Sequence, residues 1–173
     1  MKQYFLAIKE VLEVFLVALF SILFVYKFLA QPFLVQGASM EPTFRSGDYL
    51  LVDEISYRVK EPERGDLIVF RYPGNPSLFY IKRIVGLSGD EIEIVGGKIF
   101  VNGQPFDESY LPAGTQTKPF GNDKFVLGEK QFFVLGDNRS YSSDSRRWGP
   151  IEKSDIVGEV RLRFWPNPEM FKP

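Results

Sequence analysis

An uncharged apolar run near the N-terminus constrains the fold of this chain more than any other feature of its sequence. Residues 14–26 carry no charge, and extending the run to residues 11–30 adds only Glu13 and Lys27. A helix needs about 20 residues to span a bilayer, and a helix that is apolar on every side suits lipid better than a globular surface. The sequence therefore predicts an N-terminal segment, residues 1–32, that contains a single transmembrane anchor helix.

Two other structures for this segment stay open. A cleavable signal peptide would use Lys2 and Lys9 as its positive region, but bulky Phe28 would stand at position −3 of a cut after Ala30, where a small residue is required. A buried helix of a globular domain is the second alternative. The charges do not fix the orientation of an anchor, because two nearby glutamates offset the two lysines and the terminal amine.

Beyond Pro32 the pattern changes to short alternating runs that turn-forming residues separate. Three of the four Gly-Asp pairs lead directly into strand-like runs, and Gly96-Gly97 and Asn102-Gly103 are typical of two-residue hairpin turns. No segment in this part shows helical periodicity, so we predict a single all-β domain over residues 33–173, closed or sandwich-like. Its strands are expected at Phe33–Gln36, Tyr49–Val52, Leu67–Phe70, Leu78–Gly86, Glu91–Val95, Lys98–Val101, Gln131–Leu135 and Ile156–Phe164.

The composition limits the chemistry that this domain can perform. The 173 residues include no histidine and no cysteine, and 21 Lys and Arg face 22 Asp and Glu. Ser-His-Asp and Cys-His mechanisms, disulfides and imidazole- or thiolate-bound zinc are therefore excluded. The near-neutral charge argues against nucleic-acid binding, and we expect no metal or organic cofactor. Hydrolysis would have to use Ser, Thr, Lys, Tyr or carboxylates.

Two segments offer a nucleophile and a base. Ser39 lies between small residues and a proline-containing turn, which leaves its hydroxyl open to approach, although most turn serines only bond to the backbone. Lys82 lies in the predicted strand Leu78–Gly86, where it shares one face with Tyr80 and Ile84. Burial lowers the pKa of a lysine and can leave a neutral amine that acts as a general base. A solvent-facing lysine is the ordinary alternative.

A third segment, residues 136–149, gathers serines, carboxylates and arginines in one polar stretch. A calcium loop is excluded because Arg139 stands at the third ligand position and the closing glutamate is absent. We expect a hydrogen-bonded network that makes the loop rigid and orients a neighbouring group, with a solvated loop as the alternative. A turn serine, a lysine in an apolar strand and this loop together are the parts of a Ser–Lys hydrolase.

In these motifs the chain resembles type I signal peptidases, the membrane-bound endopeptidases that remove signal peptides from exported proteins. All four matching segments occur in the order of the family, behind an apolar N-terminus, so the resemblance covers essentially the whole chain. The segments are Ser-Met-Glu-Pro-Thr at 39–43, Arg-Gly-Asp-Leu-Ile-Val-Phe at 64–70, Tyr-Ile-Lys-Arg-Ile-Val-Gly-Leu-Ser-Gly-Asp at 80–90, and Gly-Asp-Asn-Arg with Ser142, Asp144, Ser145 and Arg146 at 136–146.

The resemblance implies a role for each matching residue and an antiparallel β fold for the domain. Ser39 would be the nucleophile, and its backbone N–H would donate to the oxyanion. Lys82 would be the general base, and Ser142 would hydrogen-bond to its amine and orient it. Asp144 and Arg146 would hold the loop through a salt bridge.

Three departures from the family pattern bear on these roles. Gly37 stands where some members have a second serine that contributes a hydroxyl to the oxyanion hole, so the hole should depend on backbone N–H groups. Ser88 replaces a proline that is common in the family, which we interpret as a tolerated turn substitution. The excursion at about residues 91–130 is short, so a second β subdomain is expected to be reduced to a hairpin and a loop.

The resemblance also implies substrates and a location. The substrates would be secretory preproteins with small residues, above all Ala, at positions −1 and −3. The protein would be a single-pass plasma membrane protein in contact with the lipid bilayer, with its N-terminus in the cytoplasm and its catalytic domain outside. Two other functions stay open: a self-cleaving Ser–Lys protease of the repressor type, and a membrane-tethered β domain that binds peptides without catalysis.

Overall fold

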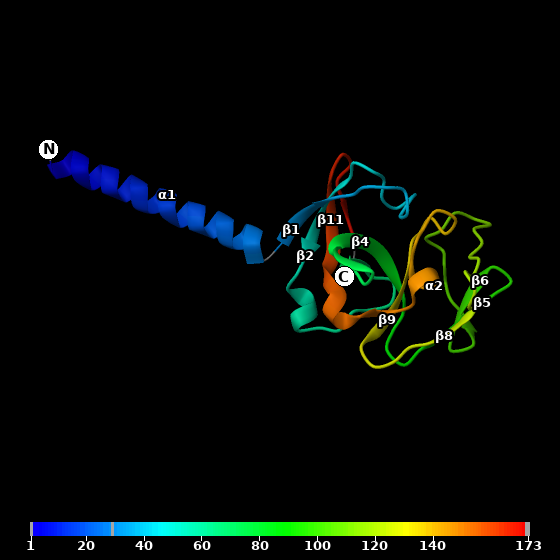
Figure 1. Ribbon diagram of the computed structural model, residues 1–173. Helices are drawn as coiled ribbons and strands as arrows, with labels where there is room; N and C mark the ends of the chain where they lie inside the picture. The colour runs from blue at the N-terminus through cyan, green and yellow to red at the C-terminus, as the bar shows by residue number, and fades with distance from the viewer. Residues whose placement is uncertain (1, 29, 172–173) are drawn as a thin grey trace.

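In the computed structural model, which describes residues 2–28 and 30–171, an N-terminal helix projects from a β domain (Figure 1). The helices are α1 (Lys2–Phe28), α2 (Ser145–Trp148) and two 3-10 turns, η1 (Ser56–Arg58) and η2 (Lys153–Asp155). The strands are β1 (Ala30–Leu34), β2 (Tyr49–Asp53), β3 (Leu67–Tyr72), β4 (Asn75–Gly86), β5 (Glu91–Val95), β6 (Lys98–Val101), β7 (Gln104–Pro105), β8 (Lys124–Val126), β9 (Gln131–Leu135), β10 (Ile151–Glu152), β11 (Ile156–Trp165) and β12 (Glu169–Met170).

The described strands form two antiparallel sheets. The larger sheet has the order β1-β2-β11-β3-β4-β9-β10, with β12 paired to β11, and the smaller sheet has the order β7-β6-β5-β8. Irregular register shifts interrupt most of the pairings in the larger sheet, including those of β11 with β2 and of β4 with β9. Such bulges bend a sheet and increase its twist, which lets the larger sheet curve around its core.

The central strand β3 explains where this core lies. Successive side chains of a strand point to opposite faces, and all four residues of Leu67–Phe70 are buried. Leu67 and Val69 pack in one apolar cluster, with Met40 and Phe44 of the turn after β1. Ile68 and Phe70 pack in another cluster on the opposite face. A continuous apolar run here therefore marks a strand that is covered on both sides.

The predicted all-β antiparallel fold is confirmed, and the strands Glu91–Val95, Lys98–Val101 and Gln131–Leu135 have the predicted bounds. Two predictions are wrong. The first strand is Ala30–Leu34 rather than Phe33–Gln36, because its backbone pairs with β2 from Ala30 onward. The excursion at residues 91–130 is more than a hairpin and a loop, because β7 and β8 extend it to a four-stranded sheet.

The N-terminal segment also differs from the prediction. It is helical over Lys2–Phe28, but in the described ranges no helix is both long and apolar enough to cross a membrane, so the predicted transmembrane helix is not confirmed. The helix stops before Ala30, which already belongs to β1. Residues 1, 29, 172 and 173, which the predicted segments 1–32 and 33–173 include, lie outside the described residues.

Candidate active site

Ser39 and Lys82 come together although 43 positions separate them in the chain. Ser39 lies in the turn that follows β1, and Lys82 lies on β4, opposite Ile68 of β3. The Lys82 Nζ and the Ser39 Oγ are 2.7 Å apart, and the same Nζ donates a second hydrogen bond of 2.8 Å to the Ile81 carbonyl oxygen. The side chain that was predicted as a base is therefore in direct contact with the predicted nucleophile.

The Lys82 amine is buried, with 3% of the residue exposed. Desolvation lowers the pKa of this amine to about 8, while the carboxylates of Asp144 and Asp137 act in the opposite direction. The Tyr80 ring, whose centroid is 5.5 Å from the Nζ, supplies part of the surrounding apolar wall. An amine with this pKa is neutral in about a tenth of the molecules at pH 7 and in about half of them at pH 8, and in that form it can accept a proton.

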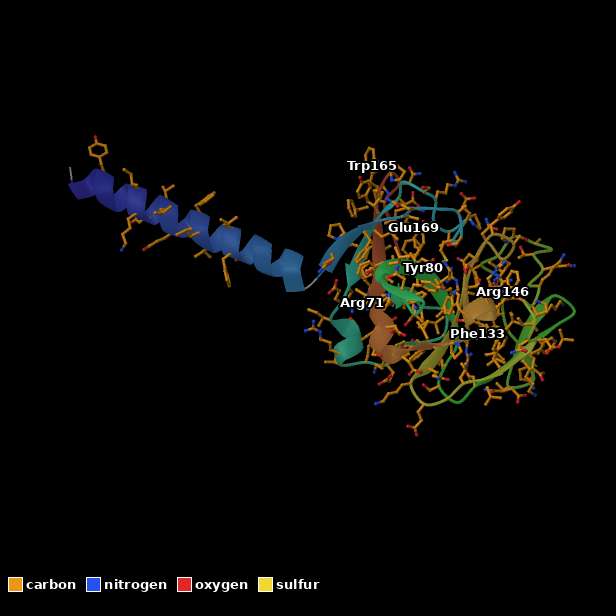
Figure 2. All side chains as sticks on the ribbon, viewed as in Figure 1. Arg71, Tyr80, Phe133, Arg146, Trp165 and Glu169 are labelled. Atoms are coloured by element: carbon orange, nitrogen blue, oxygen red, sulfur yellow. The ribbon has the colours of Figure 1, made fainter. Side chains whose placement is uncertain are left out.

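The loop after β9 carries a buried ion pair. The Arg146 Nε donates a hydrogen bond to the Asp144 Oδ1, and the Arg146 Nη2 donates one to the Asp144 Oδ2, both at 2.8 Å. Neither side chain is exposed to solvent. The same carboxylate accepts bonds from the backbone N–H groups of Gly136 and Arg146, and it caps α2. Figure 2 shows Arg146 on α2, between the two sheets. Because Arg146 occupies this carboxylate, Asp144 acts on Lys82 only from a distance.

Ser142 lies beside the dyad but does not make its predicted hydrogen bond. Its Oγ is buried and has no hydrogen-bond partner among the described residues. The Lys82 amine instead points toward Ser39 and the Ile81 carbonyl. Ser142 nevertheless lies close, because a Cβ added to Gly136 would come within 2.2 Å of the Ser142 Oγ and 2.4 Å of the Ser39 carbonyl oxygen. A glycine is therefore required at position 136.

A cleft of about 460 Å³ opens along the Ser39–Lys82 pair. Residues 33–39 line one side, and residues 78–82 of β4 line the other. Buried Leu50 and Val69 lie at its base, and highly exposed Tyr141 lies at its rim. The cleft therefore has largely apolar walls that include the Ser39–Lys82 pair. Among the described residues, no group of carboxylates is placed to hold a metal ion.

The family model for "Signal peptidase, peptidase S26" matches residues 8–165 of the chain. The chain belongs to this family. It is 38% identical over 148 residues to "Probable signal peptidase I-2" of Synechocystis sp., an alignment that covers 83% of this chain and 66% of that protein. It is 36% identical over 179 residues to "Signal peptidase IB" of Staphylococcus aureus, with 93% of each chain covered.

Among solved structures, a crystal structure of a signal peptidase I from Enterococcus faecalis V583 superposes with a TM-score of 0.51. It is 29% identical and covers 58% of this chain and 97% of its own. Membership of the family makes the protein a serine endopeptidase, and the antiparallel β domain is the part that carries its site.

Arg83 and Asp137 lie in two of the matching segments, were given no role from the sequence, and contact each other near the candidate site. Arg83 follows Lys82, and its Nε and Nη2 bind the two oxygens of buried Asp137 at 2.9 and 2.7 Å. Asp137 also accepts a bond of 2.5 Å from the Thr43 hydroxyl. These bonds tie β4 and the turn after Ser39 to one carboxylate. The Gly-Asp pair at 136–137 could have indicated Asp137, but its partners could not be read from sequence.

Asn138 is a third such residue. Its backbone N–H donates to the Ser39 carbonyl oxygen at 3.1 Å, and its side-chain Nδ2 donates to the Ala38 carbonyl oxygen at 3.0 Å. The guanidinium of the next residue, buried Arg139, donates hydrogen bonds to three side chains of the segment 91–130. These acceptors are Glu108, Thr117 and Tyr110. The loop 136–146 therefore connects the Ser39 turn on one side to the segment between β7 and β8 on the other.

Proposed function

We propose that this peptidase removes N-terminal signal peptides from secreted preproteins, with Ser39 as the nucleophile and Lys82 as the general base. The observation that carries the proposal is the 2.7 Å contact between the Lys82 Nζ and the Ser39 Oγ, two residues that line an open cleft. A peptide-binding domain without catalysis would have no use for a buried amine with a lowered pKa beside an accessible hydroxyl.

The first half of the reaction transfers the signal peptide to Ser39. The neutral Lys82 amine takes the hydroxyl proton along their existing contact while the Oγ attacks the scissile carbonyl carbon. The negative charge moves to the carbonyl oxygen, where the Ser39 backbone N–H would stabilise it. The Lys82 ammonium then protonates the leaving nitrogen, the C–N bond breaks, and the mature protein departs with its new amino terminus.

The second half releases the signal peptide from the enzyme. Lys82, neutral again, removes a proton from a water molecule that attacks the Ser39 ester. The tetrahedral intermediate collapses, the Ser39 Oγ leaves and recovers its proton from Lys82, and the signal peptide departs as a carboxylic acid. One base thus serves both halves, which suits a chain that contains no histidine.

The cleft suggests how a substrate would be selected. An extended peptide between residues 33–39 and 78–82 would place alternate side chains toward the base of the cleft. Leu50 and Val69, both almost fully buried, limit the depth available there. We infer that positions −1 and −3 take small residues, above all Ala, and that Phe at −1 is rejected.

The N-terminal segment suggests where the reaction occurs. The described side chains of α1 expose large apolar groups in contiguous turns, among them Val14, Phe15 and Val17, which is unfavourable in water and favourable against lipid. We propose that residues 1–32 attach the protein to the plasma membrane, with the N-terminus in the cytoplasm and the β domain outside. The active site would then meet preproteins as they emerge from the membrane.

A cleavage assay with purified full-length protein tests the proposal. A preprotein with Ala-x-Ala before its cleavage site should be cut after the last Ala, and Ser39→Ala should lower the rate by several orders of magnitude. Exposed Ser154, on η2, offers a matched control, and Ser154→Ala should keep the wild-type rate. Equal turnover by Ser39→Ala and wild type would refute the assigned nucleophile, and equal cleavage of Phe and Ala at −1 would refute the specificity.

A further inference from the structure

Asn138 holds the backbone of the nucleophile turn at two consecutive carbonyl groups. The bond from its Nδ2 to the Ala38 oxygen measures 3.0 Å, and the bond from its backbone N–H to the Ser39 oxygen measures 3.1 Å. Both donors come from one residue that lies 100 positions from Ala38 in the chain. The two bonds therefore fix the peptide units on either side of the Ser39 Cα.

The Ala38 carbonyl belongs to the same peptide unit as the Ser39 N–H. In a planar trans peptide the C=O and the N–H point in opposite directions, so a bond that fixes the Ala38 oxygen also fixes the direction of the Ser39 N–H. Within residues 2–28 and 30–171 this N–H donates to no acceptor. It is therefore a free donor whose orientation the Asn138 side chain helps to fix.

The turn itself supplies a second, longer bond to this oxygen, because the Glu41 N–H donates to the Ala38 carbonyl oxygen at 3.3 Å. Gly37, two residues before the nucleophile, has no side chain to donate a hydrogen bond, and its φ of 95° lies in the left-handed region that glycine tolerates. The adjacent segment bonds elsewhere: the Phe44 N–H donates to the Met40 carbonyl oxygen within the following turn. Of the two bonds that hold the Ala38 oxygen, the one from the Asn138 amide is the shorter, and it is the one that comes from outside the turn.

We propose that Asn138 is a positioning residue for the oxyanion, whose side-chain amide aims the Ser39 N–H at the negative oxygen of the tetrahedral intermediate. A hydrogen bond received at the Ala38 oxygen also polarises the shared peptide unit and strengthens its N–H as a donor. The inference rests on the proposed function, because it needs Ser39 to be the nucleophile. It adds a residue, and a step at which that residue acts, to the proposed reaction.

Steady-state kinetics of two variants provide the first test. Asn138→Ala removes the amide, and Asn138→Asp keeps its size but replaces the Nδ2 donor with an acceptor. Both should lower kcat by about 10- to 100-fold, somewhat less than deleting an oxyanion donor itself, while KM stays within twofold. The melting temperature should stay within a few degrees, because the backbone bond from residue 138 to Ser39 remains. Ser140→Ala, an exposed neighbour in the same loop, is the matched control and should behave as wild type.

A pair of inhibitors separates an oxyanion effect from a structural one. A peptide aldehyde ending in Ala-x-Ala adds to the Ser39 Oγ, whose proton goes to Lys82, and leaves a negative oxygen in the oxyanion site. The matching peptide amide binds the same cleft without forming that oxygen. In the Asn138 variants the affinity for the aldehyde should fall by the same factor as kcat/KM, and the affinity for the amide should equal that of the wild type.

The outcomes are distinct. An unchanged kcat would overturn the role of Asn138, and so would an equal loss of affinity for both inhibitors. A loss of activity that the unfolded fraction of the variant explains would also overturn it. A rising limb of the pH profile displaced from that of the wild type would also overturn it, since the effect would then act through Lys82. If wild type cleaves no preprotein, the proposed function fails and this inference fails with it. If wild type cleaves, Ser39→Ala does not, and the Asn138 variants match wild type, the inference alone fails.

Discussion

Lys82 shows at the residue scale how burial that costs stability prepares a group for chemistry. The same desolvation that lowers the pKa of the amine to about 8 makes its ammonium form unfavourable in the folded protein. The unfolded chain has no such penalty, so between pH 8 and about 10.5 it binds more protons than the native state. Folding stability should therefore rise with pH across this window.

Replacing this amine by an isosteric apolar side chain should make the fold more stable and the enzyme inactive. Below pH 8 the lowered pKa corresponds to a penalty of about 3 kcal/mol, so Lys82→Met should stabilise the domain by up to that amount at pH 7. The gain should shrink as the pH rises toward 10. Denaturant unfolding at pH 7 and 10 measures it, and a variant that is less stable than wild type at pH 7 would contradict the assigned burial penalty.

The residues of the site differ in how far sequence could identify them. Ser39 and Lys82 were predicted because the serine turn, the lysine strand and the polar loop occur together in the order of a known family, although each residue alone has an ordinary alternative. The contacts of Asp137 and Asn138 could not be predicted, because they join segments about 50 and 100 positions apart. The predicted bond from Ser142 to Lys82 is absent, because its geometry depends on rotamers that a motif does not specify.

At the element scale, the loop between β9 and α2 supports the Ser39 turn and is itself held by a buried ion pair. The Asp144–Arg146 pair is completely buried, and Arg146 also donates to the Arg139 and Lys118 carbonyl oxygens. A fully buried ion pair makes a protein little more stable than two apolar side chains in the same place would. Removing only one partner is costly, because it leaves a buried charge without compensation. The pair therefore makes the loop sensitive to single substitutions.

Removing the arginine alone tests this anchoring. Arg146→Met should destabilise the domain by about 3–5 kcal/mol, because the Asp144 carboxylate stays buried without its partner. That carboxylate already raises the Lys82 pKa, so the limb of the kcat/KM profile should also move above pH 8. The neighbouring exposed Arg147, which stacks on Phe120, provides the control Arg147→Met. Equal stability of Arg146→Met and this control would show that the pair does not anchor the loop.

The predictability of the strands depends on their length. The longer strands carry a pattern that predicts them: β5 alternates between buried and less buried residues, and β9 is a short apolar run bounded by turn residues. The strands β7, β10 and β12 contain two residues each, too few for a pattern, and they form only because a neighbour supplies the pairing. The helix α2 has four residues and depends on its Asp144 cap, so no helical periodicity precedes it.

The whole molecule consists of a helix that projects from a β domain (Figure 1). The cleft lies beside the first strand, because Phe33 and Leu34 of β1 line it. The turn that carries Ser39 follows β1 directly, and β1 follows α1, so the site lies a short chain distance from the apolar helix. We infer that this proximity keeps the cleft close to the membrane surface. The sequence predicted the helix itself, while the transition to β1 at Ala30 required the pairing with β2.

The proposed topology predicts which part of the protein a protease can reach. In intact spheroplasts, added protease should digest the β domain, because residues 33–171 would lie outside. A cytoplasmic marker protein should stay intact in the same sample, and a known outer domain should be degraded. Complete protection of the β domain under these conditions would reverse the proposed orientation.

The pH dependence of kcat/KM on an Ala-x-Ala preprotein tests the Ser39–Lys82 mechanism most directly. The amine is the base only when neutral, so the profile should rise along a single limb with an apparent pKa of about 8. Lys82→Arg should be inactive from pH 5 to 10, because guanidinium keeps its proton throughout this range. A profile that is flat across this range, or turnover by Lys82→Arg, would contradict the assignment of Lys82 as the base.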